Sequence, residues 1–443
     1  MKTKTQKLDA ILTHKLWGTL IFLFLMWFMF FCTFTLGAYP QQGIEWCMAQ
    51  LGNFLVSRIG EGYISDFVNN GVIGGVGSVL AFMPNILILF FFTSLFESTG
   101  YVQRTAYLLD GLMHKIGLHG NSFIPLLMGF GCNVPAILAT KNISEKNGKI
   151  LTMIMIPFMS CSAKVPIDLL LIGTFFPDHP ISMLFFIYGI GIFIAIITAL
   201  ILNKLVFHPT VDNTPVVLQP YKKPTPKFVL KLMWEASYEY LKKIGTVVLL
   251  AVMVIWFLDH FPEREPQHYA SSVAAIEQND SLSDTLKNSF LKDLSMEKMV
   301  YQQEHSYLGQ IGTFIAPALE PLGFDWKMSI CLVAGLPAKE FIVGTLGVLY
   351  KTEADGEEIN THLPARLKNE TYMSGEKKGE PVFNQAVALS FLIFALLYIP
   401  CIATFFSIKK EAGIKWAVFS VIYSISIAWI TAFLFYRVAL FFI

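Results

Sequence analysis

The sequence predicts an all-α polytopic membrane protein with about eight transmembrane helices and two repeated motifs that contain broken or re-entrant helices. Hydrophobic residues make up 54% of the 443 residues and charged residues only 15%. Mean hydropathy is +0.55. Several apolar runs approach the ~20 residues that a helix needs to cross a bilayer. The formal net charge is +1, so nothing indicates a nucleic-acid partner.

Nine apolar stretches are long enough, or nearly so, to cross a membrane: 17–36, 78–96, 121–140, 150–176, 181–203, 244–258, 327–350, 382–408 and 415–437. The first lacks the small-residue cleavage site of a signal peptide, so we expect it to be retained. The segments 121–140, 150–176 and 327–350 carry proline, glycine or charged residues near their middles.

The polar connections indicate sidedness and divide the chain. Residues 204–243 contain seven lysines against three acidic residues, which favours the cytoplasmic side. Residues 261–306 contain eight acidic against four basic residues, which favours the outside. Nine full crossings cannot place both the N-terminus and 204–243 in the cytoplasm. One stretch is therefore predicted to be re-entrant, and 121–140 fits best.

We expect four regions: a cytoplasmic tail over 1–16, a first membrane half over 17–208, a basic cytoplasmic linker with an amphipathic helix over 209–243, and a second membrane half over 244–443. The second half includes the polar segments 261–306 and 351–381, of which the latter is expected to be a mobile loop. Residues 101–117 and 226–243 read as amphipathic helices along the membrane interface.

The two halves contain an internal repeat. GLHGNSFIPLLMGFGCNVPA (117–136) aligns without a gap with GFDWKMSICLVAGLPAKEFI (323–342), a shift of 206 residues. Downstream, FMSCSA (158–163) aligns with YIPCIA (398–403), so that Cys161 matches Cys401 at a shift of 240. Paired interrupted segments in corresponding positions are the best sequence indication of a transporter's binding site.

Prolines in these segments are expected to free backbone carbonyls. Proline has no N–H and clashes with the carbonyl four residues earlier. Four carbonyls should thereby lose their helical donor, those of Gly131, Ser162, Val333 and Leu396. Bare carbonyls at membrane depth must face protein or a polar cavity, and carbonyl ends of helices attract cations.

Candidate ligands lie beside each break: Gly131, Cys132, Asn133, Ser160, Cys161, Ser162, Glu340 and Cys401. A charge near the bilayer centre is unfavourable by at least ~2.5 kcal/mol, so Glu340 is a functional candidate, with Lys339 or Lys164 as counter-charge. Thiol, amide, carboxylate and carbonyl donors together suit a transition metal better than calcium or magnesium. We therefore predict metal ligation by Cys132, Cys161, Cys401 and Glu340.

Other interpretations apply to the same residues. Cys32, Cys47 and Cys331 are best explained as packing residues. Lys339 and Glu340 could form a structural ion pair. Asn133 and Ser160 are evenly balanced between the two interpretations. The sequence contains no GxxxxGK[ST], HExxH or GxSxG motif, so no enzyme activity is predicted.

Several motifs resemble those of one family. NGVIGGVGSVLAFMPNILILF (70–90), SFIPLLMGFGCNVPAILAT (122–140), PFMSCSAKVPIDLL (157–170), AKEFIVGTLGVLY (338–350) and YIPCIATF (398–405) are similar to the membrane domain of the FeoB ferrous iron transporters. The last four resemble that family's two Gate motifs. The likeness extends from LTHKLWG (12–18) to the final span.

The resemblance implies uptake of ferrous iron across the bacterial inner membrane through a pore in which Cys132, Cys161, Cys401 and Glu340 matter. It implies ferrous iron as transported substrate without a permanently bound cofactor, membrane lipid as surroundings, and a small cytoplasmic accessory protein as partner. It leaves homo-oligomerisation open. Members usually begin with a cytoplasmic GTPase domain and a helical spacer, which do not occur in this sequence, so we expect the GTPase to be either a separate chain or trimmed away.

Two rival functions remain. The first is an organic-solute transporter, such as a nucleoside carrier, because Gate-type repeats resemble nucleoside-recognition segments. The breaks disfavour it, since they offer thiols instead of a rich set of hydrogen-bonding groups. The second is a membrane anchor for a separate GTPase, without transport.

Overall fold

The computed structural model describes residues 9–442 except 61, 63–66, 82, 208–224, 241–245, 279–283, 351–355 and 372–378. These residues are helical apart from turns and one isolated antiparallel bridge between Thr371 and Pro381. Within them, five helices are long and apolar enough to cross a membrane, or six if the bent pair Met83–Phe96 and Tyr101–Lys115 is one span. The predicted all-α polytopic membrane class is confirmed. The count of eight spans stays a prediction.

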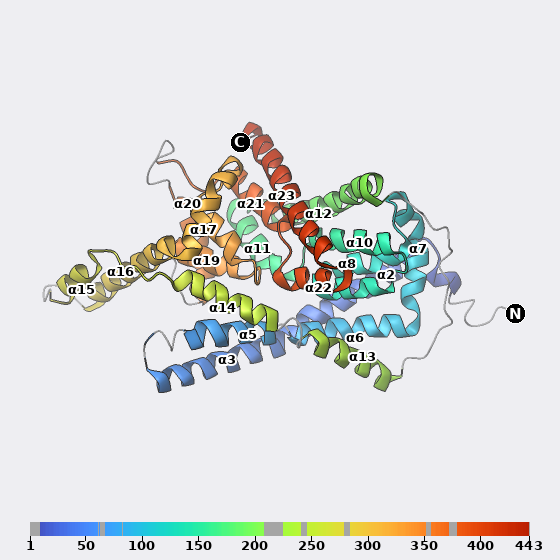
Figure 1. The fold of residues 1–443 in the computed structure, drawn as a ribbon, viewed down its shortest axis with the longest axis horizontal. Helices are drawn as coiled ribbons and strands as arrows, with labels where there is room; N and C mark the ends of the chain where they lie inside the picture. Colours follow the sequence, from blue (N-terminus) through green and yellow to red (C-terminus); the bar gives the residue numbers. More distant parts are fainter. Residues whose placement is uncertain are drawn as a thin grey trace. The chain divides into compact units, whose positions relative to one another are not determined.

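The first half contains these helices (Figure 1): α2 (Trp17–Phe31), α3 (Gly37–Ile59), α5 (Gly74–Ala81), α6 (Met83–Thr99), α7 (Tyr101–Lys115), α8 (Phe123–Met128), α9 (Asn133–Ala139), α10 (Lys146–Met155), α11 (Val165–Phe175) and α12 (Pro180–Leu202). The remainder contains α13 (Pro226–Tyr240), α14 (Thr246–His260), α15 (Tyr269–Glu277), α16 (Asp284–His305), α17 (Tyr307–Leu319), α18 (Trp326–Ala334), α19 (Phe341–Leu349), α20 (Gly356–Asn369), α21 (Gln385–Leu397), α22 (Ile402–Ala412) and α23 (Ile414–Phe442).

The chain forms two compact units, each built mainly from one half and completed by segments of the other. Unit 1 contains Met1–Ser162, Tyr188–Met253 and Ile402–Ser424, and unit 2 contains Ala163–Ile187, Val254–Cys401 and Ile425–Ile443. Two of the exchanges fall at helix breaks. The first follows Ser162 and the second follows Cys401, which are adjacent positions of the repeat.

The first predicted span belongs to a longer helix. Trp17–Arg58 is one apolar helical run of 42 residues, in which the π-helix Cys32–Leu36 connects α2 to α3. Pro40 lies four residues beyond Leu36 and cannot donate to its carbonyl, which accounts for the local widening of the helix. In unit 1, α3 and α5 lie side by side, and the amphipathic helix α13 packs along α6 (Figure 1).

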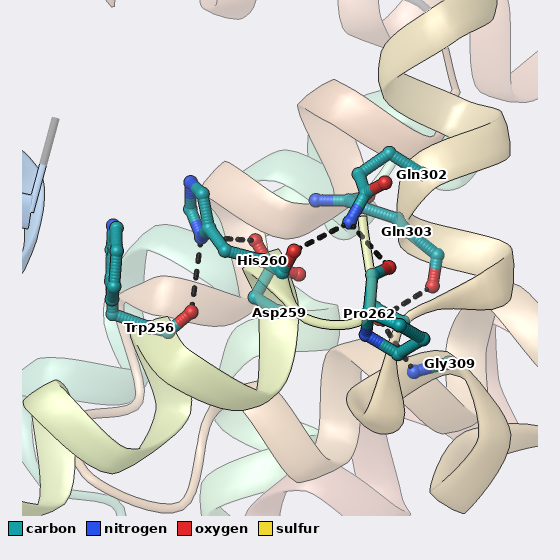
Figure 2. Close-up of polar contacts among 8 residues, drawn as sticks. Trp256, Asp259, His260, Pro262, Gln302, Gln303 and Gly309 are labelled. Carbon is teal, nitrogen blue, oxygen red and sulfur yellow. Dashed lines mark hydrogen bonds and ion pairs between the residues drawn. The ribbon is translucent and has the colours of Figure 1, made fainter. Parts of the chain in front are cut away.

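The polar segment 261–306 is mostly a pair of helices, α15 and α16, which contact each other. Figure 2 shows how its two ends are joined. The Gln302 amide nitrogen donates to the carbonyls of His260 (2.7 Å) and Pro262 (3.2 Å). The Gln302 amide oxygen accepts from the Arg264 N–H (2.7 Å). The Gln302 side chain of α16 thus forms hydrogen bonds with the backbone groups at and just after the end of α14.

The predicted mobile loop at 351–381 contains helix α20, so that expectation was wrong for this part of the segment. Leu363 and Leu367, one helical turn apart, are fully buried, and α20 packs against α11. This spacing gives an otherwise polar stretch one apolar face, which is enough to hold it on the protein. Residues 351–355 and 372–378 lie outside the described residues.

The repeat is visible in the backbone. Helix α7 begins at Tyr101 and α17 at Tyr307, and α8 ends at Met128 while α18 ends at Ala334. Both pairs differ by 206 residues, the shift found in the sequence. The matched glycines Gly117 (φ +76°) and Gly323 (φ +83°) adopt the same left-handed conformation, which L-residues disfavour. The two segments therefore share conformation as well as alignment.

Candidate ion path at the helix breaks

In the first repeat the helix breaks fall before the prolines rather than at them, whereas Pro337 and Pro400 of the second repeat lie inside their breaks. Helix α8 ends at Met128, Cys132 is extended (φ −153°, ψ 130°), and α9 begins at Asn133 with Pro135 as its third residue. In the first turn of a helix an N–H has no intrahelical acceptor, so a proline there is tolerated. Pro166 similarly lies in the first turn of α11. Each of these two prolines therefore lies in the first turn of a new helix instead of interrupting one.

The carbonyl of Gly131, predicted to lose its helical donor, has two donors from the second break. It accepts from the Ser162 backbone N–H (3.3 Å) and from the Ser162 hydroxyl (3.1 Å). Two candidates that the sequence placed at separate breaks are thus joined directly in unit 1. The joined backbone brings the segment around Cys132 next to the segment around Cys161.

Two buried oxygens beside this junction lack a hydrogen-bond partner. Asn133 is 6% exposed and Ser160 is 1% exposed. Within the described part of the chain, neither the Asn133 Oδ1 nor the Ser160 Oγ accepts or donates a hydrogen bond. A buried polar atom left unsatisfied is unfavourable by ~1–3 kcal/mol, so such atoms are rare without a role. Both oxygens are available for a ligand.

The cysteines at the breaks share one degree of exposure. Cys132, Cys161 and Cys401 are partly exposed, whereas Cys32 and Cys331 are buried and Cys47 is exposed. None of the six cysteines, all of which the structure describes, forms a disulfide. A thiol needs access to react with or ligate a metal. Exposure is therefore compatible with the predicted roles of the three break cysteines.

In unit 2, buried lysines contact the carbonyls at the end of α21. Lys164 Nζ donates to the Leu396 carbonyl (2.5 Å), and Lys339 Nζ donates to the Ile399 carbonyl (2.9 Å). The Leu396 carbonyl was predicted to be freed by Pro400. The Val333 carbonyl, predicted to be freed by Pro337, accepts from the Leu336 N–H (3.1 Å).

Asp168 is a charged residue that the site prediction did not include. It lies in the first turn of α11, is 3% exposed, and its Oδ2 has no hydrogen-bond partner within the described ranges. The rule applied to Glu340, a charge within an apolar run, would have found it in VPIDLLL. Glu340 itself precedes α19 and is partly exposed.

The predicted site residues are divided between the two units. Unit 1 holds Gly131, Cys132, Asn133, Ser160, Cys161 and Ser162, and unit 2 holds Glu340 and Cys401. The described residues contain no group of three or more His, Cys, Asp or Glu side chains that could hold a metal ion. Ligation by Cys132, Cys161, Cys401 and Glu340 stays a prediction.

These features define an all-α polytopic membrane protein built on a repeat of broken helices. A family model described as "Nucleoside recognition", named Gate, matches residues 79–175 and 241–415, and a model described as "Ferrous iron transport protein B C terminus" matches residues 184–235. The chain belongs to the FeoB family of ferrous iron transporters and corresponds to its membrane part.

Curated relatives match over almost the whole chain. An "Fe(2+) transport protein A/Fe(2+) transporter FeoB fusion protein" of Porphyromonas gingivalis is 44% identical over 447 residues, covering 100% of this chain and 52% of the relative. The Fe(2+) transporter FeoB of Campylobacter jejuni is 38% identical, covering 97% and 64%. That of Methanocaldococcus jannaschii is 34% identical, covering 97% and 58%. The chain thus spans about half to two thirds of their length. No solved structure matches it.

Proposed function

We propose that this chain forms the membrane path for ferrous iron uptake across the bacterial inner membrane. The relatives named Fe(2+) transporter FeoB support the substrate. The observation that carries the proposal is the pair of buried, unpartnered oxygens on Asn133 and Ser160, each adjacent to a partly exposed thiol, Cys132 or Cys161. A passing cation would satisfy these oxygens, which a purely structural break would leave unpaired.

The donor set suits weak binding of a borderline metal. Amide and hydroxyl oxygens are hard donors and thiols are soft ones, and a mixture favours divalent transition metals over calcium or magnesium. Two neutral oxygens and two thiols bind more weakly than a closed thiolate cage, which helps the ion leave. Inward movement of two charges releases about 4.6 kcal/mol per 100 mV of membrane potential. The potential alone can therefore drive uptake once the path is open.

Control of opening is assigned to a GTPase domain outside this sequence, on the same or a separate chain. The chain contributes no phosphate-binding loop of its own. The P. gingivalis relative is named as a fusion with Fe(2+) transport protein A, which supports a small protein of that kind as accessory partner. In this scheme nucleotide hydrolysis gates the path, while the membrane potential supplies the driving force.

The test is metal flux into liposomes that contain this chain alone. A potential, negative inside, would be imposed, and Fe²⁺, Mn²⁺ and Zn²⁺ entry would be compared. We expect Fe²⁺ entry that depends on the potential and falls in Cys132→Ser and Cys161→Ser. Cys47→Ser is the matched control, because Cys47 is an exposed cysteine in α3, away from the breaks. Wild-type liposomes no more permeable to Fe²⁺ than empty ones would refute transport by the chain on its own and favour the membrane-anchor function.

Nucleoside transport is the second candidate, favoured by the name of the matching Gate family model, "Nucleoside recognition". It predicts saturable uptake of a labelled nucleoside into the same liposomes. That uptake would survive replacement of Cys132 and Cys161, since a nucleoside is recognised by hydrogen bonds and stacking and needs no thiol. Fe²⁺ flux without nucleoside uptake would exclude it.

A further inference from the structure

The buried end of α21 is a strongly electronegative position. Helix α21 belongs to the candidate span Gln385–Ala412, and nearly all of its residues are buried. The last carbonyls of a helix have no intrahelical donor and carry the negative end of its dipole. Pro400 removes one more donor, the one that a continuous helix would offer to the Leu396 carbonyl. A cation is the natural partner for such carbonyls.

Two lysine side chains supply the positive charge. Lys164 is 4% exposed and Lys339 is 3% exposed. Their Nζ atoms lie 2.5 Å from the Leu396 oxygen and 2.9 Å from the Ile399 oxygen. They come from distant segments, Lys164 from the start of α11 and Lys339 from the turn before α19, yet they converge on one helix end.

The contacts of Lys339 reinforce this arrangement. Its Nζ lies 3.3 Å from the centre of the Tyr398 ring, and the Tyr398 hydroxyl donates to the Leu332 carbonyl (3.2 Å). An aromatic face attracts an ammonium group just as it attracts other cations. Ring and carbonyl together form a cation-binding surface, fixed to α18 by the tyrosine hydroxyl.

The carboxylate of Asp168 offers the ammonium group of Lys164 a second binding partner. Asp168 lies four residues after Lys164, the residue that directly precedes α11, and interacts with its charge. Its Oδ2 has no hydrogen-bond partner in the part of the chain that the structure describes. Lys164 can therefore exchange a carbonyl oxygen for a carboxylate oxygen without becoming a lone buried charge, which would be strongly unfavourable.

We propose that the carbonyl oxygens of Leu396 and Ile399 form a divalent-cation site, which Lys164 and Lys339 occupy as tethered cations until an arriving ion displaces them. Two ammonium groups carry the same charge, +2, as one ferrous ion, so the exchange conserves charge at the site. Lys164 then pairs with Asp168, while Lys339 gives up the Ile399 carbonyl and keeps its contact with the Tyr398 ring. The proposal rests on the proposed function, because it makes this site a step of the permeation path and the two lysines its closed state.

The test measures Fe²⁺ flux into liposomes against external Fe²⁺ concentration. Lys164→Met removes the competing ammonium group, so the half-saturating concentration should fall about tenfold, since apparent affinity scales with the fraction of vacant sites. Asp168→Asn removes the partner of the displaced lysine and should raise that concentration about threefold or more. Lys164→Arg, which keeps the charge, should stay nearer to wild type than Lys164→Met.

Lys327→Met is the matched control. Lys327 also belongs to unit 2 and lies over a tyrosine ring, that of Tyr350 at 4.6 Å, but its ion pair is with Glu370 (2.6 Å). Its loss should leave the half-saturating concentration unchanged. If the lysines only capped the helix, replacing them would change the amount of folded protein and therefore the maximal flux. The half-saturating Fe²⁺ concentration would then not shift in opposite directions in Lys164→Met and Asp168→Asn.

The proposal is overturned if the half-saturating Fe²⁺ concentration is unchanged in Lys164→Met. It is also overturned if that concentration shifts in the same direction in Lys164→Met and Asp168→Asn. If Lys164→Met does not fold, an unchanged value in Asp168→Asn overturns it alone. Binding of Mn²⁺ to the detergent-solubilised chain, followed by the loss of the free-ion EPR signal, separates this proposal from the proposed function. Tighter Mn²⁺ binding in Lys164→Met supports the site even if the wild type transports nothing, and equal binding contradicts it.

Discussion

The two repeats share a backbone but differ in where they carry charge. At the first break, Asn133 and Val134 occupy the positions that Lys339 and Glu340 occupy in the second repeat, because both pairs differ by 206 residues. At the second break the first repeat carries the charged residues and the second repeat does not. Lys164 and Asp168 of the first repeat correspond, at a shift of 240, to Thr404 and Ile408 of the second.

Each repeat therefore contributes one lysine and one carboxylate, but at different breaks. The residue exchange between units places all four, Lys164, Asp168, Lys339 and Glu340, in unit 2. Unit 1 retains the neutral donors of the first break. The two repeats therefore share a geometry but not their chemistry: unit 1 holds the neutral oxygens and the thiols of Cys132 and Cys161, whereas unit 2 holds the charged side chains together with the thiol of Cys401.

The largest effect is expected for Glu340→Gln, which removes a charge that only the second repeat has at this break. We expect Fe²⁺ flux to fall about 10- to 100-fold, because hydrogen bonds and contacts to a charged group are worth ~1.5–3 kcal/mol. Flux into liposomes at equal protein density checks it. Glu320→Gln, an exposed glutamate of unit 2, is the control. Equal flux in both variants would show that the charge difference between the repeats has no role in transport.

The conformational equivalence of the repeats can be tested at their matched glycines. Gly117→Ala and Gly323→Ala each force an L-residue into a left-handed conformation, so each should lower the free energy of unfolding by ~1–2 kcal/mol. An added Cβ would also approach the Asn203 side chain (2.0 Å) or the Tyr436 ring (2.8 Å). Thermal unfolding in detergent measures the loss.

Gly189→Ala is the control for the glycine pair, since Gly189 lies inside α12 and an added Cβ there meets nothing within 4 Å. Replacing a glycine inside a helix by alanine should be neutral or slightly stabilising. If only one of the two matched glycines tolerated alanine, the local likeness of the repeats would be limited to their alignment.

The sequence predicted the fold class, the interrupted segments and the repeat, because each depends on composition or local chain chemistry. It did not predict α20, whose helical form depends on burial of Leu363 and Leu367 against α11. It also left the freed carbonyls of Gly131 and Leu396 without partners. Their donors, Ser162 and Lys164, lie 31 and 232 residues away, and nothing local in the sequence specifies such contacts.

The matched cysteines give a third test of the comparison. Cys161 and Cys401 occupy the same position of the repeat and are both partly exposed. If the thiols ligate the passing ion, Cys161→Ser and Cys401→Ser should each lower Fe²⁺ flux by about tenfold, the lower end of the loss seen when a contributor to a metal site is removed. Cys331→Ser should instead affect stability, because Cys331 is fully buried in α18. If only one of the variants Cys161→Ser and Cys401→Ser lost flux, only one of the two matched breaks would ligate the metal.

The smallest effect is expected at Asn133, the neutral counterpart of Lys339. Replacement by leucine keeps the size of the side chain and removes the unpartnered Oδ1. Flux should fall about two- to tenfold, since a neutral hydrogen bond or dipole contact contributes ~0.5–1.5 kcal/mol. The stability of the chain should be unchanged or higher, because the variant relieves a buried polar atom that has no partner among the described residues. Lower flux in a more stable protein separates a ligand from a packing residue. If flux and stability fell together, Asn133 would stabilise the structure of the break, and its neutral amide oxygen would have no role in binding the ion.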